Sequence, residues 1–134
     1  ITQVVEVTQE QFTGYGIVKG GNFIHASEYP FLKDGHLFGK VLKNPVNHEL
    51  SLEKYAGQTV YSINYDHPVR EDTCLVESME GAAFFYVCLL EGVDFCQIRA
   101  ISNYTGIHDK KQWKTSEALD NLAKNVHRII KSIM

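Results

Sequence analysis

Cysteine is scarce in this 134-residue chain, which contains only Cys74, Cys88 and Cys96. Their number is odd and no two of them have the CxxC spacing, which argues against a disulfide framework and a thiolate zinc site. The six histidines are scattered without HxxxH or HxH spacing, so they do not indicate a metal site either. We expect a protein of a reducing compartment, the cytoplasm.

An excess of positive charge and a long apolar run are missing as well. Sixteen acidic and thirteen basic residues give a net charge of −3, so nucleic acid is not the expected partner. The longest nearly apolar run, residues 81–90, is shorter than the roughly 20 residues that cross a bilayer. The 44% of apolar and 22% of charged residues exclude intrinsic disorder and suit a single domain over residues 1–134.

The first half of the chain shows little regular pattern. Residues 1–8 contain three valines and predict a strand. Glycines and prolines interrupt residues 9–57, so we predict mostly loop there, with room for a short strand or a helical turn. Residues 58–64 return to strand character, and residues 65–72 predict a polar turn.

The second half alternates strand and helix more clearly. We predict a strand over 73–77, a helix over 79–91 that Ser78 caps and Gly92 ends, and a strand over 95–102. Apolar residues lie on every side of that helix, which predicts burial almost all round. A strand, a helix and a strand in this order predict parallel strands with a right-handed crossover. Residues 115–134 predict an amphipathic helix that covers one side of the sheet.

Two predicted strand ends carry polar residues that packing does not require. Glu80 begins the apolar helix, where the helix dipole favours an acid for purely structural reasons. An ionised carboxylate is also an acceptor for a vicinal diol such as the ribose hydroxyls. Arg99 needs an acidic partner inside its strand, and Ser102 and Asn103 follow at the strand's end. Asn103 is either an ordinary turn residue or a reader of a heteroaromatic edge. Parallel strands would place Glu80 and Asn103 on the same side.

The segments VESMEGAAFFYVCLLEG and FCQIRAISN carry a resemblance to a known family. Together they resemble the purine nucleoside phosphorylase and nucleosidase superfamily, in particular its methylthioadenosine/adenosylhomocysteine nucleosidase branch, and within it the futalosine hydrolases of the alternative menaquinone route. The resemblance implies an α/β fold, a three-layer sandwich with a central mixed, mostly parallel sheet. It also implies that residues 1–134 are the C-terminal portion of a larger domain, so that Ile1 is not the start and the water-activating acid lies elsewhere.

The resemblance also implies roles for single residues. Glu80 would hold the ribose hydroxyls with Met79 against the sugar, and Ser102 would orient Asn103. Asn103 stands where adenine-cleaving relatives have an aspartate that protonates the base. An asparagine cannot act as that acid, but it can bind N7 and O6 of a 6-oxopurine, so the departure favours hypoxanthine as the leaving base. Arg99 would brace the loop, and Tyr61 could stack on the purine.

Several functions stay open at this point. The resemblance implies a nucleosidase that hydrolyses the N-glycosidic bond of futalosine, without metal or organic cofactor, in a homo-oligomer. The alternatives are a methylthioadenosine/adenosylhomocysteine nucleosidase, a phosphorylase that uses phosphate, and a catalytically inactive fragment that only binds a nucleoside.

Overall fold

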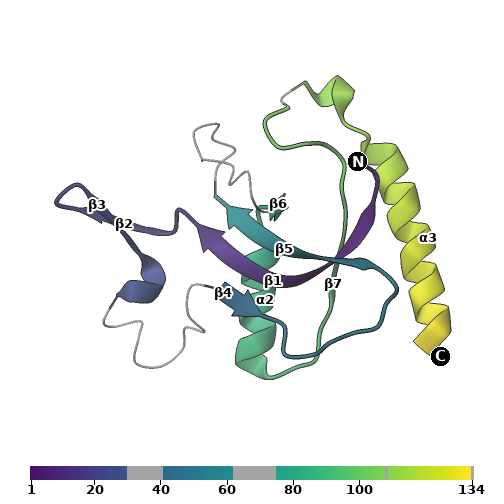
Figure 1. Cartoon of the computed structure of the whole chain (residues 1–134), viewed down its shortest axis with the longest axis horizontal. Helices are drawn as coiled ribbons and strands as arrows, with labels where there is room; N and C mark the ends of the chain where they lie inside the picture. The colour runs from purple at the N-terminus through teal and green to yellow at the C-terminus, as the bar shows by residue number, and fades with distance from the viewer. Residues whose placement is uncertain (30–40, 62–74, 108, 134) are drawn as a thin grey trace.

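The computed structural model describes residues 1–29, 41–61, 75–107 and 109–133 (Figure 1). Its elements follow one another as β1 (Val4–Thr13), β2 (Gly16–Lys19), β3 (Asn22–His25), the 3-10 turn η1 (Ala26–Glu28), β4 (Val41–Lys43), β5 (Glu53–Val60), β6 (Leu75–Ser78), α2 (Gly81–Glu91), β7 (Gln97–Ala100), the 3-10 turn η2 (Lys110–Gln112) and α3 (Thr115–Ile133). Within these described ranges, a mixed sheet with two helices confirms the predicted α/β class. No described helix combines the length and apolar character that a bilayer crossing requires.

The central sheet has five strands, in the order β4-β1-β5-β6 with β7 also paired to β1. Strands β1, β5 and β6 are parallel, while β4 and β7 run antiparallel to β1. The strand predicted over 1–8 is confirmed and extends to Thr13. Of the predicted strands 58–64 and 73–77, residues 62–64, 73 and 74 lie outside the described residues, as does the predicted turn 65–72.

The predicted parallel β-α-β unit is wrong, because β7 runs opposite to β6. The direction of β7 is explained by its pairing with β1, on the edge opposite to β5. There β4 pairs with Gln9–Gln11 and β7 pairs with Val4–Val7, so the two short strands follow each other along one edge in one direction. Asn44, just after β4, donates from Nδ2 to the backbone oxygen of Phe95 at 2.7 Å and ties the two together.

Residues 9–57 are also more regular than predicted. They hold the end of β1, the antiparallel hairpin β2–β3, strand β4 and the start of β5. Gly20 and Gly21, both with positive φ (59° and 79°), form the two-residue turn of the hairpin. Gly20 and Gly21 therefore separate two paired strands, in a segment that we predicted to be mostly loop. The hairpin extends away from the central sheet (Figure 1).

Helix α2 ends as predicted, but it begins at Gly81, two residues later than predicted, and it is not buried all round. The hydroxyl of Ser78 accepts from the backbone N–H of Gly81 at 2.9 Å, and Gly92 ends the helix in the left-handed conformation. Ala82 and Phe85 are buried, whereas Val87 is 55% exposed on another side of the helix. The described chain thus covers one side of a helix that is apolar on all sides.

The C-terminal helix α3 packs against β7 and β1 (Figure 1). Ala118 and Ile129 are buried, while Leu119, Ile130 and Ile133 of the predicted apolar stripe are exposed. Asn121 donates from Nδ2 to the backbone oxygen of Thr2 at 3.0 Å, so the packing side of α3 includes polar contacts to the start of the chain.

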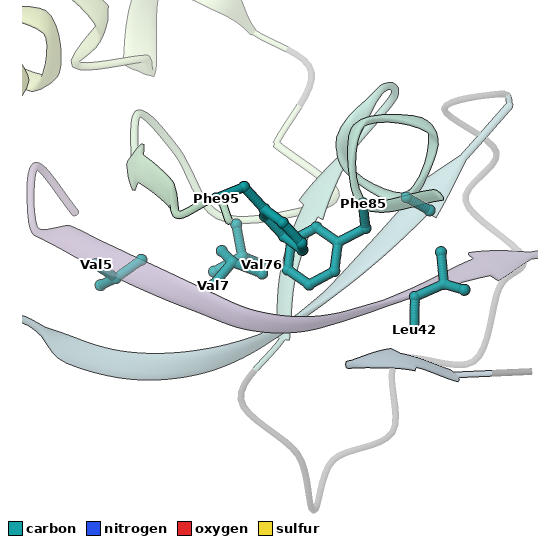
Figure 2. Close-up of a cluster of buried hydrophobic side chains, with 7 residues drawn as sticks. Val5, Val7, Leu42, Val76, Phe85 and Phe95 are labelled. Carbon is teal, nitrogen blue, oxygen red and sulfur yellow. The ribbon is translucent and has the colours of Figure 1, made fainter. Parts of the chain in front are cut away.

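The hydrophobic core lies between α2 and the sheet. Figure 2 shows Phe85 from α2 against Phe95, with the valines of β1 nearby. The rings of Phe85 and Phe95 meet edge to face with centroids 4.8 Å apart, a favourable aromatic geometry. Phe85 is therefore the residue that fixes the helix to the sheet.

We expect Phe85→Ala to lower the free energy of unfolding by about 3–5 kcal/mol, the usual cost of a large-to-small change in a core. Phe84→Ala is the matched control, because its ring is partly exposed. Urea denaturation measures both variants. An equal loss in both would contradict this assignment of the core.

Candidate functional site

A cavity of about 570 Å³ lies over the sheet beside the segment that follows β7. Its floor comes from β1, β5, β6 and β7, with Glu77 and Arg99 among the polar side chains. Ser102, Asn103 and residues of the segment up to Trp113 form its wall. Figure 1 shows this segment passing over the N-terminal end of β1 before α3 begins.

Glu80 and Arg99 form an ion pair that joins the start of α2 to β7. Arg99 donates from Nη1 to Oε1 of Glu80, and the backbone N–H of Met79 donates to Oε2 at 3.1 Å. The hydrogen bond from Arg99 lowers the pKa of Glu80 below its ordinary value of 4.5. The expectation that Arg99 needs an acidic partner is confirmed. The Glu80 side chain nevertheless remains largely exposed, so its oxygens can still accept from a diol.

The Asn103 amide has a fixed orientation at the cavity wall. Ser102 donates from Oγ to Oδ1 of Asn103 at 2.6 Å. Nδ2 of Asn103 donates to the backbone oxygen of Tyr104 at 3.1 Å. An amide nitrogen carries two hydrogens, so among the described residues one N–H is left to donate to a ligand.

The structure brings only some of the predicted site residues together. Ser102, Asn103 and Arg99 line the cavity. Glu80 does not line it but forms an ion pair with Arg99. Met79 and Tyr61 are exposed and are not among the lining residues. The expectation that parallel strands place Glu80 and Asn103 on the same side is wrong, because β6 and β7 run in opposite directions. The ion pair between Arg99 and Glu80 instead joins the start of α2 to the strand that leads into Ser102 and Asn103.

Sequence reasoning missed Glu10, a fully buried carboxyl on β1. It accepts from Nε2 of Gln97 at 2.8 Å and from Oγ1 of Thr59 at 3.2 Å. Burial raises the pKa of Glu10 above 4.5, while these two hydrogen bonds and the charge of Arg99 act in the opposite direction. Residues after Thr8 that are compatible with a strand could have indicated that β1 continues to Glu10. We predicted loop from residue 9 and therefore did not consider Glu10.

The mixed sheet and its helices define an α/β protein, with a cavity beside β7. A sequence model described as the Phosphorylase superfamily matches residues 58–134, more than half of the chain, and the chain belongs to that family. It is 49% identical over 55 residues to futalosine hydrolase of Thermus thermophilus. That match covers 41% of this chain and 24% of the relative. No solved structure matches the chain.

We expect Arg99→Met to raise the pKa of Glu80 toward 4.5, because the largest cause of its depression is removed. A lowered pKa stabilises the fold above pH 4.5, and this stabilisation is lost as the pH falls through the folded-state pKa. The variant should therefore lose less stability on acidification than the parent chain. Carbon-13 NMR titration of the carboxyl measures the pKa.

Arg128→Met is the control for this titration. Arg128 lies exposed on α3 and donates to Asn125 at 3.1 Å. Its removal changes the net charge equally and should leave the Glu80 titration unchanged. A Glu80 pKa that does not move in Arg99→Met would contradict the assigned cause.

Proposed function

We propose that this chain contributes to a nucleosidase that hydrolyses the N-glycosidic bond of futalosine and releases hypoxanthine. Membership of the Phosphorylase superfamily supports a nucleoside substrate. The identity to futalosine hydrolase of Thermus thermophilus over 55 residues supports the particular nucleoside. The observation that carries the proposal is the oriented amide of Asn103 at the cavity wall.

The hydrogen bonds of Asn103 favour a 6-oxopurine. Its Oδ1 already accepts from Ser102, whereas one N–H of Nδ2 has no partner in the described part of the chain and can donate. A 6-oxopurine presents two acceptors at its N7 and O6 edge, and adenine presents an acceptor and an amino donor. A free donor therefore complements hypoxanthine better than adenine.

Glu80 is the proposed ligand of the ribose hydroxyls. Its carboxyl is ionised near neutral pH, and the hydrogen bond from Arg99 lowers its pKa further below 4.5. An ionised carboxylate accepts from both hydroxyls of a diol and places negative charge beside the sugar. We propose that Met79 packs against the sugar and that Tyr61 stacks on the base.

In the proposed reaction the oxygen of a water molecule bonds to C1′ as the C1′–N9 bond breaks, and the water gives up one proton, which leaves a hydroxyl group on C1′. The base leaves with the electron pair of that bond and takes up a proton. Positive charge develops on the ribose and negative charge on the base in the transition state. Glu80 would stabilise the first and the Asn103 amide the second, both by preorganised electrostatics.

We further propose that the protein works as a cytoplasmic homo-oligomer and serves menaquinone synthesis. The described residues include exposed apolar side chains on the β2–β3 hairpin, Ile17, Val18 and Phe23, which suit a contact between copies. Sedimentation of the protein expressed from its complete reading frame tests the assembly.

Base release from futalosine, methylthioadenosine and inosine tests the function, each measured with and without phosphate. We expect hypoxanthine from futalosine at a rate that phosphate does not change. Activity that depends on phosphate would indicate phosphorolysis, the alternative that the family also supports. Adenine release that exceeds hypoxanthine release would contradict the proposed role of Asn103.

We expect Asn103→Asp to shift the preference from hypoxanthine toward adenine nucleosides by about tenfold, the change that one hydrogen bond of ordinary strength makes. An aspartate removes the free donor and adds an acceptor or, when protonated, an acid. Asn125→Asp on α3 is the matched control, since it makes the same change away from the cavity. An unchanged ratio of the two kcat/KM values in Asn103→Asp would count against this site.

A further inference from the structure

Glu10 lies where β1, β5, β7 and α2 meet. Its side chain is 1% exposed, yet it accepts hydrogen bonds from β7 through Gln97 and from β5 through Thr59, at 2.8 and 3.2 Å. A carboxylate only accepts, so two donors that converge on its two oxygens complement it. Glu10 therefore fixes the relative position of three strands.

The same carboxyl also holds the first turn of α2. Oγ1 of Thr59, which donates to Glu10, accepts from the backbone N–H of Ala82 at 2.7 Å. Gly81, the first residue of α2, approaches so closely that a Cβ there would lie 1.9 Å from Oε1 of Glu10. A Cβ at Gly57 would lie 2.4 Å from the same oxygen. The start of the helix thus rests directly on the carboxyl.

Glu80 immediately precedes Gly81, so its position depends on this contact. Gln97 and Arg99 are two residues apart on β7 and point to the same side of the strand. Gln97 binds Glu10, and Arg99 binds Glu80. One strand therefore holds both carboxylates, and Glu10 sets where the helix start places the second.

We propose that Glu10 is a positioning residue for the Glu80–Arg99 pair. Glu10 is not among the residues that line the cavity, so it acts through Glu80 and not on the substrate. This inference rests on the proposed function for the role of Glu80 in binding ribose. The contacts among Glu10, Thr59, Gly81 and Gln97 stand independently of that function.

A double-mutant cycle of Glu10→Gln and Glu80→Gln tests the proposal in the protein expressed from its complete reading frame. We expect Glu10→Gln to lower kcat/KM for futalosine about tenfold, as the loss of a hydrogen bond to a buried donor does. When Glu80 is already replaced by glutamine, Glu10→Gln should lower kcat/KM by less than about twofold, because the carboxylate that Glu10 positions is absent. Equal losses in both backgrounds would overturn the proposal.

Glu6→Gln is the matched control. Glu6 lies on the same strand and is fully buried, with Lys54 at 3.9 Å from its Oε2 and no hydrogen bond to its carboxylate oxygens among the described residues. Its substitution makes the same chemical change away from Gly81 and Thr59. Any effect of Glu6→Gln on kcat/KM should be the same with Glu80 or with glutamine at that position. Coupling to Glu80 as large as that of Glu10 would contradict a specific role for Glu10.

The pKa of Glu80 separates this proposal from the proposed function. We expect Glu10→Gln to raise that pKa, because the pairing with Arg99 loosens. Simple removal of a nearby negative charge would lower it. If Glu10→Gln raises the Glu80 pKa but Glu80→Gln leaves turnover unchanged, the positioning role of Glu10 is upheld and the ribose role of Glu80 is refuted. An unchanged or lowered pKa would overturn the positioning role.

Thr59 gives a second route if Glu10→Gln does not fold. Thr59→Val removes the hydroxyl between Glu10 and Ala82, and Thr59→Ser retains it. We expect Thr59→Val to reproduce the rise in the Glu80 pKa and Thr59→Ser to restore the parent value. The same pKa in both variants would overturn the proposal.

Discussion

The burial of the Glu10 carboxyl is the constraint on which the rest of the structure depends. A carboxyl removed from water destabilises the fold unless donors replace the lost hydration. Here the donors come from β5 and β7, and the charge of Arg99 also favours the ionised form. Since β1, β5 and β7 must all reach this point, the arrangement of the sheet and the entry of α2 are set together. Gly57 and Gly81 leave the space that the carboxyl fills.

The antiparallel direction of β7 follows from the way β4 and β7 share one edge of β1. It has a consequence for the site. Because β7 runs back toward the N-terminal end of β1, Gln97 reaches Glu10 first, Arg99 reaches Glu80 next, and Ser102 and Asn103 arrive last at the cavity wall. The polar residues are therefore arranged along a single strand and its continuation. In a parallel unit they would have gathered at the tips of two strands.

Local signals in the sequence predicted the local structure of helix ends well. They did not predict how the strands are arranged in the sheet. The end of α2 at Gly92 and the start of α3 at Thr115 depend on neighbouring residues, and both are confirmed. Ser78 does bind the start of α2, but the helix begins at Gly81 and not at Met79 as predicted. The direction of β7 depends on which edge of β1 is free, and the edge is decided by β4, which lies in a segment predicted as loop. Glu10 was missed for the same reason. A carboxyl becomes informative only when its strand is known to continue and to be covered by a helix.

The electrostatic difference between the two parts of the site supports its proposed chemistry. Glu80 is ionised near neutral pH, since its pKa lies below 4.5, and its largely exposed carboxylate is the negative end of the Glu80–Arg99 ion pair. The Asn103 part is neutral and offers a donor whose direction Ser102 and Tyr104 fix. When a nucleoside is cleaved, the sugar becomes positive and the base negative. A carboxylate near the first and a donor near the second match both charges, and neither group must reorient as the charges develop. In the proposed reaction the Glu10 contact would contribute by fixing the helix start on which such preorganisation depends, although Glu10 lies outside the cavity.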